Sequence, residues 1–280
     1  MKFGVNTFIW SETFGPHSLE LLPRIKEAGF DGMQVPLFRP KEFPAAQVRK
    51  AFEENGLECS VCALFVDGQS LISDDAAKRK EAQQHIQDTI AASAEAGAKF
   101  VGGPLYCQVG YLPGRRRTAD EWKWAIEGYQ SAIPALKAHD MQFGIEPLNR
   151  FETFFLNTNA DAAAICDAVG DPRVGVLCDT FHANIEEKDL GESMRKLGKH
   201  LKHLHTCEND RGIPGSGHVQ WESMFRGLRD IGYDGWLTIE SFGFEGALSA
   251  AVCIWRDIEK SPDAVAFEGV KFLRRAAAAA

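Results

Sequence analysis

The sequence predicts an α/β protein with a (β/α)₈ fold, the TIM barrel, formed by a single domain over residues 1–275. Short runs rich in β-forming residues alternate with amphipathic helical stretches along the whole 280-residue chain. Eight such pairs follow one another without a long linker or a break in composition, which favours a closed barrel. An open doubly wound sheet is the alternative, but the turn after the first expected strand, SETFGPHS, is not a Gly-rich phosphate loop. The alanine run at 276–280 is not interpreted.

Each element is predicted from its residue pattern and from the turn residues around it. The strands are expected at 2–10, 30–38, 57–65, 99–106, 142–149, 174–182, 201–208 and 235–241. The helices are expected near 18–28, 44–55, 75–96, 118–138, 159–169, 190–200, 220–231 and 246–258. Several helices end at a glycine that leads into the next strand, as in EAGFDG and DIGYDG. Glycine takes the left-handed conformation at a helix C-terminus without a Cβ penalty.

Composition excludes several classes of protein. Hydrophobic residues make up 45% of the chain and charged residues 25%, which are ordinary values for a folded globular protein. No apolar run approaches the roughly 18 residues of a membrane span, so no membrane association is expected. The net charge of −8 argues against a nucleic-acid partner. The single basic cluster, Arg115–Arg117, is interpreted as a solvated loop.

The cysteines indicate a reducing compartment. There are seven, an odd number without a disulfide framework, so a cytoplasmic location is expected. Cys59 and Cys62 lie in the strand-like run LECSVCALF. Strand alternation sends residues three apart to opposite faces, so both are interpreted as core residues and not as a metal or redox pair.

Polar side chains stand at the ends of the last four expected strands. Glu146, Asp179, His205 and Glu240 occupy these positions in FGIEPLNRFE, VGVLCDTFH, LKHLHTCEND and WLTIESF. Strand alternation puts each of them opposite apolar neighbours that suit the outer helices, so the four face the barrel axis. Chemistry in these barrels sits where strands end and βα loops begin. Charged groups gathered there need partners or a metal, because an unpaired buried charge is very costly.

The donor set indicates a hard divalent cation. Three carboxylates and one neutral imidazole suit Mn²⁺, Mg²⁺ or Co²⁺ with positions open for substrate oxygens. The absence of thiolates argues against a structural zinc site. The alternative for any one of the four is an ordinary salt-bridged core charge.

Other residues near strand ends can be interpreted either as part of a ligand site or as ordinary core residues. Phe8, Trp10, Tyr106 and Phe242 are candidates for an apolar wall beside a ligand, although aromatic residues in such runs are more often core. His203 is interpreted as an interior residue below the site and not as a ligand.

The later motifs resemble a known family. The strings IEPLNRFE, CDTFHANIEE, HLHTCENDRGIPGSGHVQW and YDGWLTIESF resemble the D-tagatose 3-epimerase family, which includes the D-psicose (allulose) and L-ribulose 3-epimerases. That family belongs to the xylose-isomerase-like TIM barrel superfamily. The resemblance spans nearly the whole chain and is densest over 144–258. The loop GGPLYCQVGYLPGRRR after the fourth strand matches less clearly.

The resemblance implies an activity and residue roles. It implies a divalent metal, Mn²⁺ first and Co²⁺ or Mg²⁺ next, held by Glu146, Asp179, His205 and Glu240. It implies that Glu146 and Glu240 are also the catalytic pair, and that the substrate contacts are Glu152, His182 and Arg211. The expected reaction inverts C3 of a free ketohexose or ketopentose through a cis-enediolate, with one glutamate on each face of the sugar. The resemblance also implies a homodimer or homotetramer.

The chemistry that such a reaction requires agrees with this expectation. Removing a proton from a carbon next to a ketone needs Lewis-acid assistance, and inversion needs two proton-transfer groups. An aldose–ketose or hydroxypyruvate-type isomerase on the same scaffold is the alternative function. A related endonuclease-like hydrolase is a more distant one, disfavoured by the acidic charge and by the single histidine in the expected metal set. A non-catalytic sugar- or metal-binding barrel is the last alternative.

Overall fold

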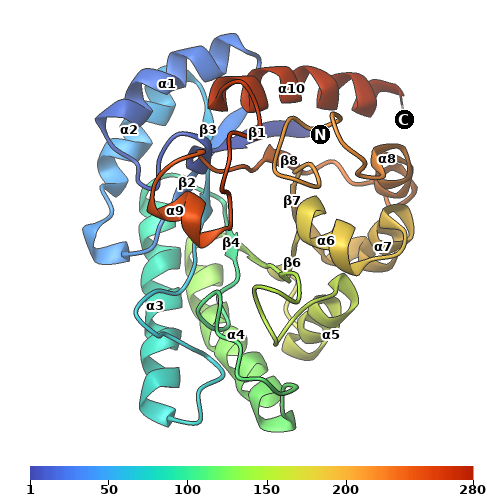
Figure 1. The fold of residues 1–280 in the computed structure, drawn as a ribbon. Coiled ribbons are helices and arrows are strands. Elements are labelled where there is room, and N and C mark those ends of the chain that lie inside the picture. The colour runs from blue at the N-terminus through green and yellow to red at the C-terminus, as the bar shows by residue number, and fades with distance from the viewer. Residues whose placement is uncertain (280) are drawn as a thin grey trace.

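The computed structural model describes residues 1–279 and shows the predicted closed barrel of parallel strands (Figure 1). Each strand pairs with the next along the chain, and the last pairs with the first. The strands are β1 (Lys2–Asn6), β2 (Gly32–Pro36), β3 (Glu58–Cys62), β4 (Phe100–Gly103), β5 (Gln142–Ile145), β6 (Val174–Asp179), β7 (Leu201–His205) and β8 (Trp236–Ile239). The barrel therefore brings all eight strand ends to one mouth, as the sequence predicts.

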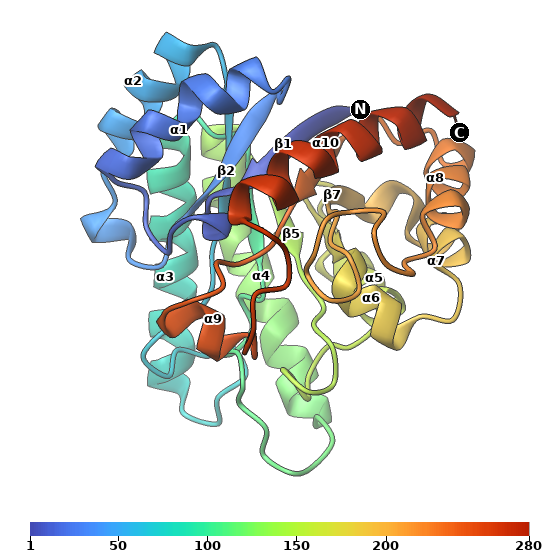
Figure 2. The same cartoon turned by 45° about the horizontal axis from the view of Figure 1, so that its top comes forward.

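Helices surround the strands in both views (Figures 1 and 2). They are α1 (Pro16–Glu27), α2 (Ala45–Asn55), α3 (Ala76–Glu95), α4 (Ala119–His139), α5 (Asn159–Val169), α6 (Thr180–Glu186), α7 (Leu190–Leu197), α8 (Trp221–Asp230), α9 (Ala247–Ala251) and α10 (Pro262–Ala279). Short 3₁₀ turns are η1 (Thr7–Ile9), η2 (Pro40–Glu42) and η3 (Gly198–His200). Among residues 1–279, no helix has the length and apolar character needed to cross a membrane.

The expected strands are longer than the observed ones because their last residues turn into the βα loops. The clearest case is the expected strand 174–182, which ends at Asp179. The side chain of Asp179 accepts a hydrogen bond from the backbone N–H of Phe181 and so caps α6. His182 therefore lies on a short helix and not on a strand.

The helix expected at 246–258 is wrong in most of its length. Only Ala247–Ala251 is helical, and the chain then turns through Cys253, whose φ is +60°. The helix that covers β8 is instead α10, which the pattern reading missed. Its start carries a recognisable signal, because Ser261 accepts from the backbone N–H of Ala264 and Pro262 stands at the first helical position. This helix runs into the uninterpreted alanine run, and Ala280 lies outside the described residues.

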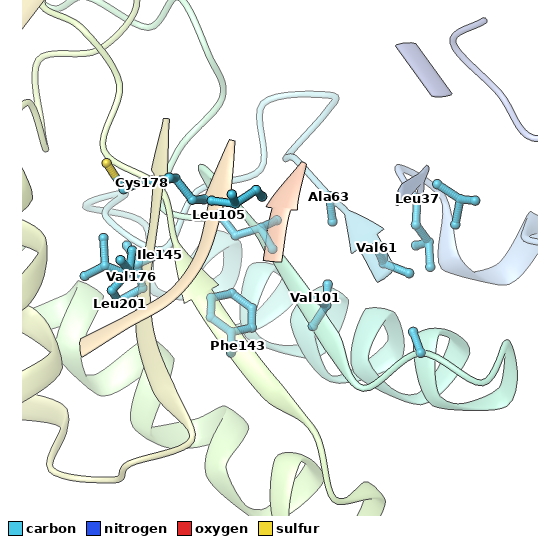
Figure 3. Packing of buried hydrophobic residues seen from close by; sticks show 14 of the residues in the cluster. Leu37, Val61, Ala63, Val101, Leu105, Phe143, Ile145, Val176, Cys178 and Leu201 are labelled. Atoms are coloured by element: carbon cyan, nitrogen blue, oxygen red, sulfur yellow. The ribbon is translucent and has the colours of Figure 1, made fainter. Parts of the chain in front are cut away.

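Apolar side chains on the outer face of the strands pack against the helices. Figure 3 shows part of this layer, with Phe143, Ile145 and Val176 among the labelled residues. The ring of Phe143 lies 5.7 Å from that of Tyr129 in α4. This packing fixes which side chains of each strand turn inward.

An aromatic stack fills the barrel below its mouth. His203 lies between Phe100 and Trp236, with ring centroids 4.5 and 6.3 Å away. The Phe100 ring occupies the space above Gly144, where a Cβ would lie 2.6 Å from the ring. His203 is thus an interior residue below the site, as the sequence predicts.

The Arg115–Arg117 cluster is exposed at Arg115 and Arg116, as the sequence predicts, but two of its three arginines also form ion pairs. Arg115 makes two hydrogen bonds to Glu121, at 2.7 and 3.0 Å. Arg117 makes two to Asp161, at 2.9 and 3.0 Å. Paired carboxylates from α4 and α5 therefore hold the long loop after β4 against the barrel.

Candidate metal centre

Four side chains from successive strand ends meet at the mouth of the barrel. Each offers one ligand atom, and these atoms lie within 4.8 Å of one another; the residues are Glu146 after β5, Asp179 ending β6, His205 ending β7 and Glu240 after β8. All four are buried, with 3%, 1%, 0% and 5% of their surface exposed. The structure therefore brings together the complete set that the sequence singled out.

Strand geometry explains why these four face inward. Asp179 is in register with His205, and His205 with Thr238, so neighbouring strands present their polar residues at the same level. The preceding residues point outward: Cys178 accepts a hydrogen bond from Asn159 in α5. Because side chains alternate along a strand, packing one set on the helices turns the other into the barrel.

Positive groups are interleaved with the carboxylates. His205 Nδ1 lies 3.3 Å from Glu146 and 3.4 Å from Glu240. The Nη1 of Arg211 donates to Asp179 Oδ2 at 2.7 Å and to Glu240 Oε2 at 3.1 Å. Arg211 is 5% exposed and has a φ of +67°, so its position is strongly constrained.

This environment shifts the pKa values of Glu146 and Glu240 in opposite directions. Burial raises the pKa of Glu146 to about 7. Burial also opposes ionisation of Glu240, but the positive charges of His205 and Arg211 outweigh it and lower the pKa of Glu240 to about 2. For His205, burial is likewise outweighed, by the two glutamates, and its pKa rises to about 10. Two like side chains in one site thus have different affinities for a proton.

The sequence-predicted substrate contacts lie beside this cluster, and two of them, His182 and Glu152, are linked by Asn149. Its backbone N–H and its side-chain Nδ2 lie 3.2 and 2.9 Å from His182 Nδ1. The same Nδ2 donates to Glu152 Oε1 at 2.8 Å. A backbone N–H can only donate, so His182 Nδ1 is an acceptor, while Nε2 lies 3.3 Å from the Nη2 of Arg211. Burial lowers the pKa of His182 to about 3, which keeps the ring neutral.

Two of the four candidate wall residues lie at the site. Phe8 stacks on Phe242 with ring centroids 5.5 Å apart, and the Arg211 guanidinium lies 5.1 Å from the Phe242 ring. Trp10 packs instead on α10, where its indole donates to Asp263. Tyr106 is buried against Phe155 in the core. The wall interpretation is therefore wrong for Trp10 and Tyr106.

The two cysteines of LECSVCALF separate as expected. Cys59 packs against the outer core, while Cys62 clusters with Phe8 and Phe242 on the inner side. Cys62 therefore belongs to the wall of the site and not to the main core.

A cavity of about 650 Å³ opens beside Glu152 and Arg211. Its rim includes the exposed aromatic side chains of Phe151 and Trp255. The polar side chains of Asn149, Glu152 and Arg211 thus share this cavity with apolar ones, as is common for small-molecule sites.

Sequence reasoning missed several residues that shape the site. Asn6 and Gln34 are fully buried polar residues inside the barrel, and Glu208 is a buried carboxylate beyond β7. Asn149 stands in the NRFE string but was given no role there. The available signal for Asn6 and Gln34 was a polar residue inside an apolar strand, which requires a buried partner.

The donor set fits a divalent cation. Three carboxylates and an imidazole are hard or intermediate ligands, and the buried His205 Nδ1 makes no well-aligned hydrogen bond within residues 1–279. A cation at this point would be met by four convergent ligand atoms without a rearrangement of the strands.

Comparison with known proteins places the chain in a family. The model of the xylose isomerase-like TIM barrel family matches residues 22–276. A probable ketose 3-epimerase of Synechocystis sp. is 35% identical over 98% of this chain and 96% of its own length. The D-psicose 3-epimerase of Agrobacterium fabrum is 31% identical over 91% of this chain and 88% of its own.

Solved structures agree with the sequence comparison. The D-allulose 3-epimerase of Methylomonas sp. in complex with D-allulose superposes with a TM-score of 0.93 at 25% identity, covering 98% of this chain and 96% of the other. A D-psicose 3-epimerase in the presence of D-fructose gives 0.92 at 28% identity, covering 99% of each chain. The barrel, the buried acidic cluster and these matches together show that the chain belongs to the xylose isomerase-like TIM barrel family and groups there with the carbohydrate epimerases known as ketose 3-epimerases.

Proposed function

We propose that this protein is a metal-dependent 3-epimerase of a free ketohexose or ketopentose. The observation that carries the proposal is the buried cluster of Glu146, Asp179, His205 and Glu240 at the barrel mouth. Relatives named as D-psicose and L-ribulose 3-epimerases support the choice of a six- or five-carbon ketose.

The four cluster residues would hold the cation, with Mn²⁺ proposed first and Co²⁺ or Mg²⁺ next. When bound, the ion supplies Lewis-acid polarisation of the substrate's carbonyl and hydroxyl oxygens. Asp179 is already fixed by its cap on α6 and by Arg211, so it offers a preorganised oxygen.

Two glutamates provide the proton transfers. Glu146 and Glu240 come from β5 and β8, and enter the mouth from different sides of the barrel. In one direction of the reaction, one carboxylate takes the proton from C3 and leaves a planar cis-enediolate. The other carboxylic acid then returns a proton to C3 from the opposite face, which inverts the centre.

The neighbouring residues orient the sugar. His182 turns its Nε2 toward the site, 3.3 Å from Arg211 Nη2 and 3.8 Å from Asp179 Oδ2, while Asn149 holds Nδ1 on the other side. Arg211 adds a fixed multi-donor guanidinium, held over the Phe181 ring at 4.0 Å. Glu152 offers carboxylate oxygens for substrate hydroxyl groups.

The test is an assay of the purified protein against free ketopentoses and ketohexoses, with products separated by chromatography. We expect inversion at C3 with the carbonyl kept at C2. A product whose carbonyl has moved would instead establish the aldose–ketose isomerase. We also propose that the protein is cytoplasmic and forms a homodimer or homotetramer. Sedimentation analysis tests the oligomeric state.

Isotope exchange tests the two-base scheme. In D₂O, the Glu146→Gln and Glu240→Gln variants should each lose epimerisation and lose exchange at C3 from one face. The exposed Glu127→Gln is the matched control and should behave as wild type. Full activity after chelation of metal, or unchanged exchange in both glutamine variants, would contradict the mechanism.

A further inference from the structure

A chain of two buried side-chain amides leads from Asn6 at the end of β1 to His205. Asn6 in β1, Gln34 in β2 and His205 in β7 are all fully buried. Asn6 Nδ2 donates to Gln34 Oε1 at 2.8 Å, and His205 Nε2 lies 2.8 Å from the same oxygen. The side of His205 that faces away from the carboxylate cluster is therefore in contact with Gln34.

Hydrogen-bond chemistry fixes the orientation of every group in this chain. The backbone N–H of Phe8 donates to the Oδ1 of Asn6 at 2.9 Å, and a backbone N–H cannot accept. The side-chain oxygen of Asn6 is thereby identified, so its Nδ2 must be the atom that faces Gln34. Because Nδ2 only donates, Gln34 must present its oxygen, and His205 Nε2 must then carry a proton.

The opposite orientation of Gln34 is unfavourable. It would place the Nε2 of Gln34 against the Nδ2 of Asn6, two donors at hydrogen-bond distance. In the observed orientation, Gln34 Nε2 makes no hydrogen bond to any of residues 1–279 and is buried. An unpartnered buried donor destabilises the fold, and this applies to Gln34 Nε2. The hydrogen bond between Gln34 Oε1 and His205 Nε2 offsets part of that free energy.

The proton on Nε2 determines the role of the other ring nitrogen of His205, Nδ1. With a proton held on Nε2, Nδ1 is the nitrogen of His205 that gives up its proton to become a ligand when a cation binds. Nδ1 is also the nitrogen that faces Glu146 at 3.3 Å and Glu240 at 3.4 Å. The amide chain thus points the ligand nitrogen at the other members of the cluster.

We propose that Gln34 is a positioning residue, oriented by Asn6, that holds the proton on His205 Nε2 so that Nδ1 binds the cation. This inference rests on the proposed metal-dependent function. A hydrogen bond from the far nitrogen of a histidine ligand fixes its tautomer and ring orientation, and its loss typically weakens metal binding about 10–100-fold.

Substitutions at position 34 test the role without an activity assay. Gln34→Met keeps the side-chain length but removes the acceptor, and Mn²⁺ affinity measured by calorimetry should fall about 10–100-fold. Gln34→Glu keeps an acceptor for both Asn6 and His205, and should bind Mn²⁺ at least as tightly as wild type. Ser60→Ala is the matched control, since Ser60 is a buried polar residue in register with Gln34 on β3 and should leave affinity unchanged. Equal affinity in the Met variant, with circular dichroism of the wild-type form, would overturn the proposal.

Nuclear magnetic resonance of wild-type protein labelled with ¹⁵N-histidine needs no variant. With Mg²⁺ bound, the His205 ring should show a protonated Nε2 and an Nδ1 shifted by the ion. A ring bound through Nε2, or one protonated at Nδ1, would overturn the role of Gln34 while leaving the metal centre in place. If Mg²⁺ and Mn²⁺ perturb no signal of His205, the inference falls together with the metal centre of the proposed function.

Discussion

Asn149 shows how one residue sets the chemistry of its neighbours. It directs its backbone N–H and its side-chain amide at His182 Nδ1 and binds Glu152 through the same amide. Its contacts fix the ring of His182 with Nε2 turned toward the site. They also hold Glu152 in place. Burial raises the pKa of Glu152.

We expect Asn149→Ala to lower kcat/KM for the ketose about 10–100-fold. Loss of a hydrogen bond to a charged or buried partner costs about 1.5–3 kcal/mol, and each 1.4 kcal/mol is a factor of ten. Steady-state kinetics measures this effect. Mn²⁺ affinity is the internal control, because Asn149 is hydrogen-bonded to none of the four cluster residues and affinity should stay constant. Unchanged kinetics would show that His182 and Glu152 need no such support.

At the scale of elements, buried polar residues hold the loops that carry the site. The loop between β7 and α8 carries Arg211 and wraps around Glu208. This carboxylate accepts hydrogen bonds from three backbone N–H groups and from the Trp221 indole. It is fully buried, and the backbone N–H of Arg211 donates to its carbonyl oxygen. The loop therefore has a polar core of its own.

Glu208 gives the loop an acid-sensitive stability. Burial alone would raise the pKa of Glu208, but the N–H of Val219, the Trp221 indole and the other donors outweigh it and lower that pKa below 4.5. A group whose pKa is lower in the folded state stabilises the fold above its unfolded pKa, and this contribution is lost as the pH falls. We expect Glu208→Gln to be less stable than wild type at pH 7, with a difference that shrinks below about pH 4. Urea unfolding at both pH values measures it, and a difference independent of pH would contradict the explanation.

The backbone conformation at the end of β4 requires a glycine. Gly103 has a φ of +145°, and a Cβ there would lie 1.9 Å from the carbonyl oxygen of Ala63, the residue that follows β3. We expect Gly103→Ala to lower the free energy of unfolding by about 3 kcal/mol or more, from strain and from the displaced strand. Gly68→Ala is the matched control, because Gly68 has a φ of +75° with open space around it and should cost about 1 kcal/mol. Equal thermal stabilities of the two variants would contradict this reading of the β4 end.

At the scale of the whole molecule, the closed barrel makes one site from distant segments. The cluster spans residues 146 to 240, and the amide chain that supports it begins at Asn6 in β1. These segments meet because β8 pairs with β1 and closes the sheet. A cation bound to the cluster would therefore connect β5, β6, β7 and β8 at the mouth.

We accordingly expect the whole domain to gain stability on binding metal. A ligand that binds only the folded state adds about 2.7 kcal/mol at a concentration of 100 Kd. Differential scanning fluorimetry should show a rise in Tm with Mn²⁺ and its reversal by a chelator. Asp179→Asn should abolish the rise, while the exposed Glu54→Gln should keep it. A Tm insensitive to Mn²⁺ in the wild-type protein would contradict a metal centre in the cluster.

The sequence by itself determined the barrel and the identity of the four cluster residues. Both follow from local rules, since the order of strands and helices and the period-two alternation within a strand are visible in a short window. The same rules failed at 246–258, where they predict one long helix, whereas helix α10 begins at the Ser261–Pro262 signal. Glu152, His182 and Arg211 stay predicted substrate contacts.

Tertiary structure alone decided how those residues are supported. The roles of Asn6, Gln34 and Asn149 depend on which atoms of remote strands lie within hydrogen-bond distance, and no local pattern contains that information. The opposite pKa shifts of Glu146 and Glu240 likewise come from burial and from charges brought close by closure of the barrel. Side-chain alternation is a property of a few neighbouring residues, whereas hydrogen-bond partners and electrostatic environment arise only when segments far apart in the chain meet.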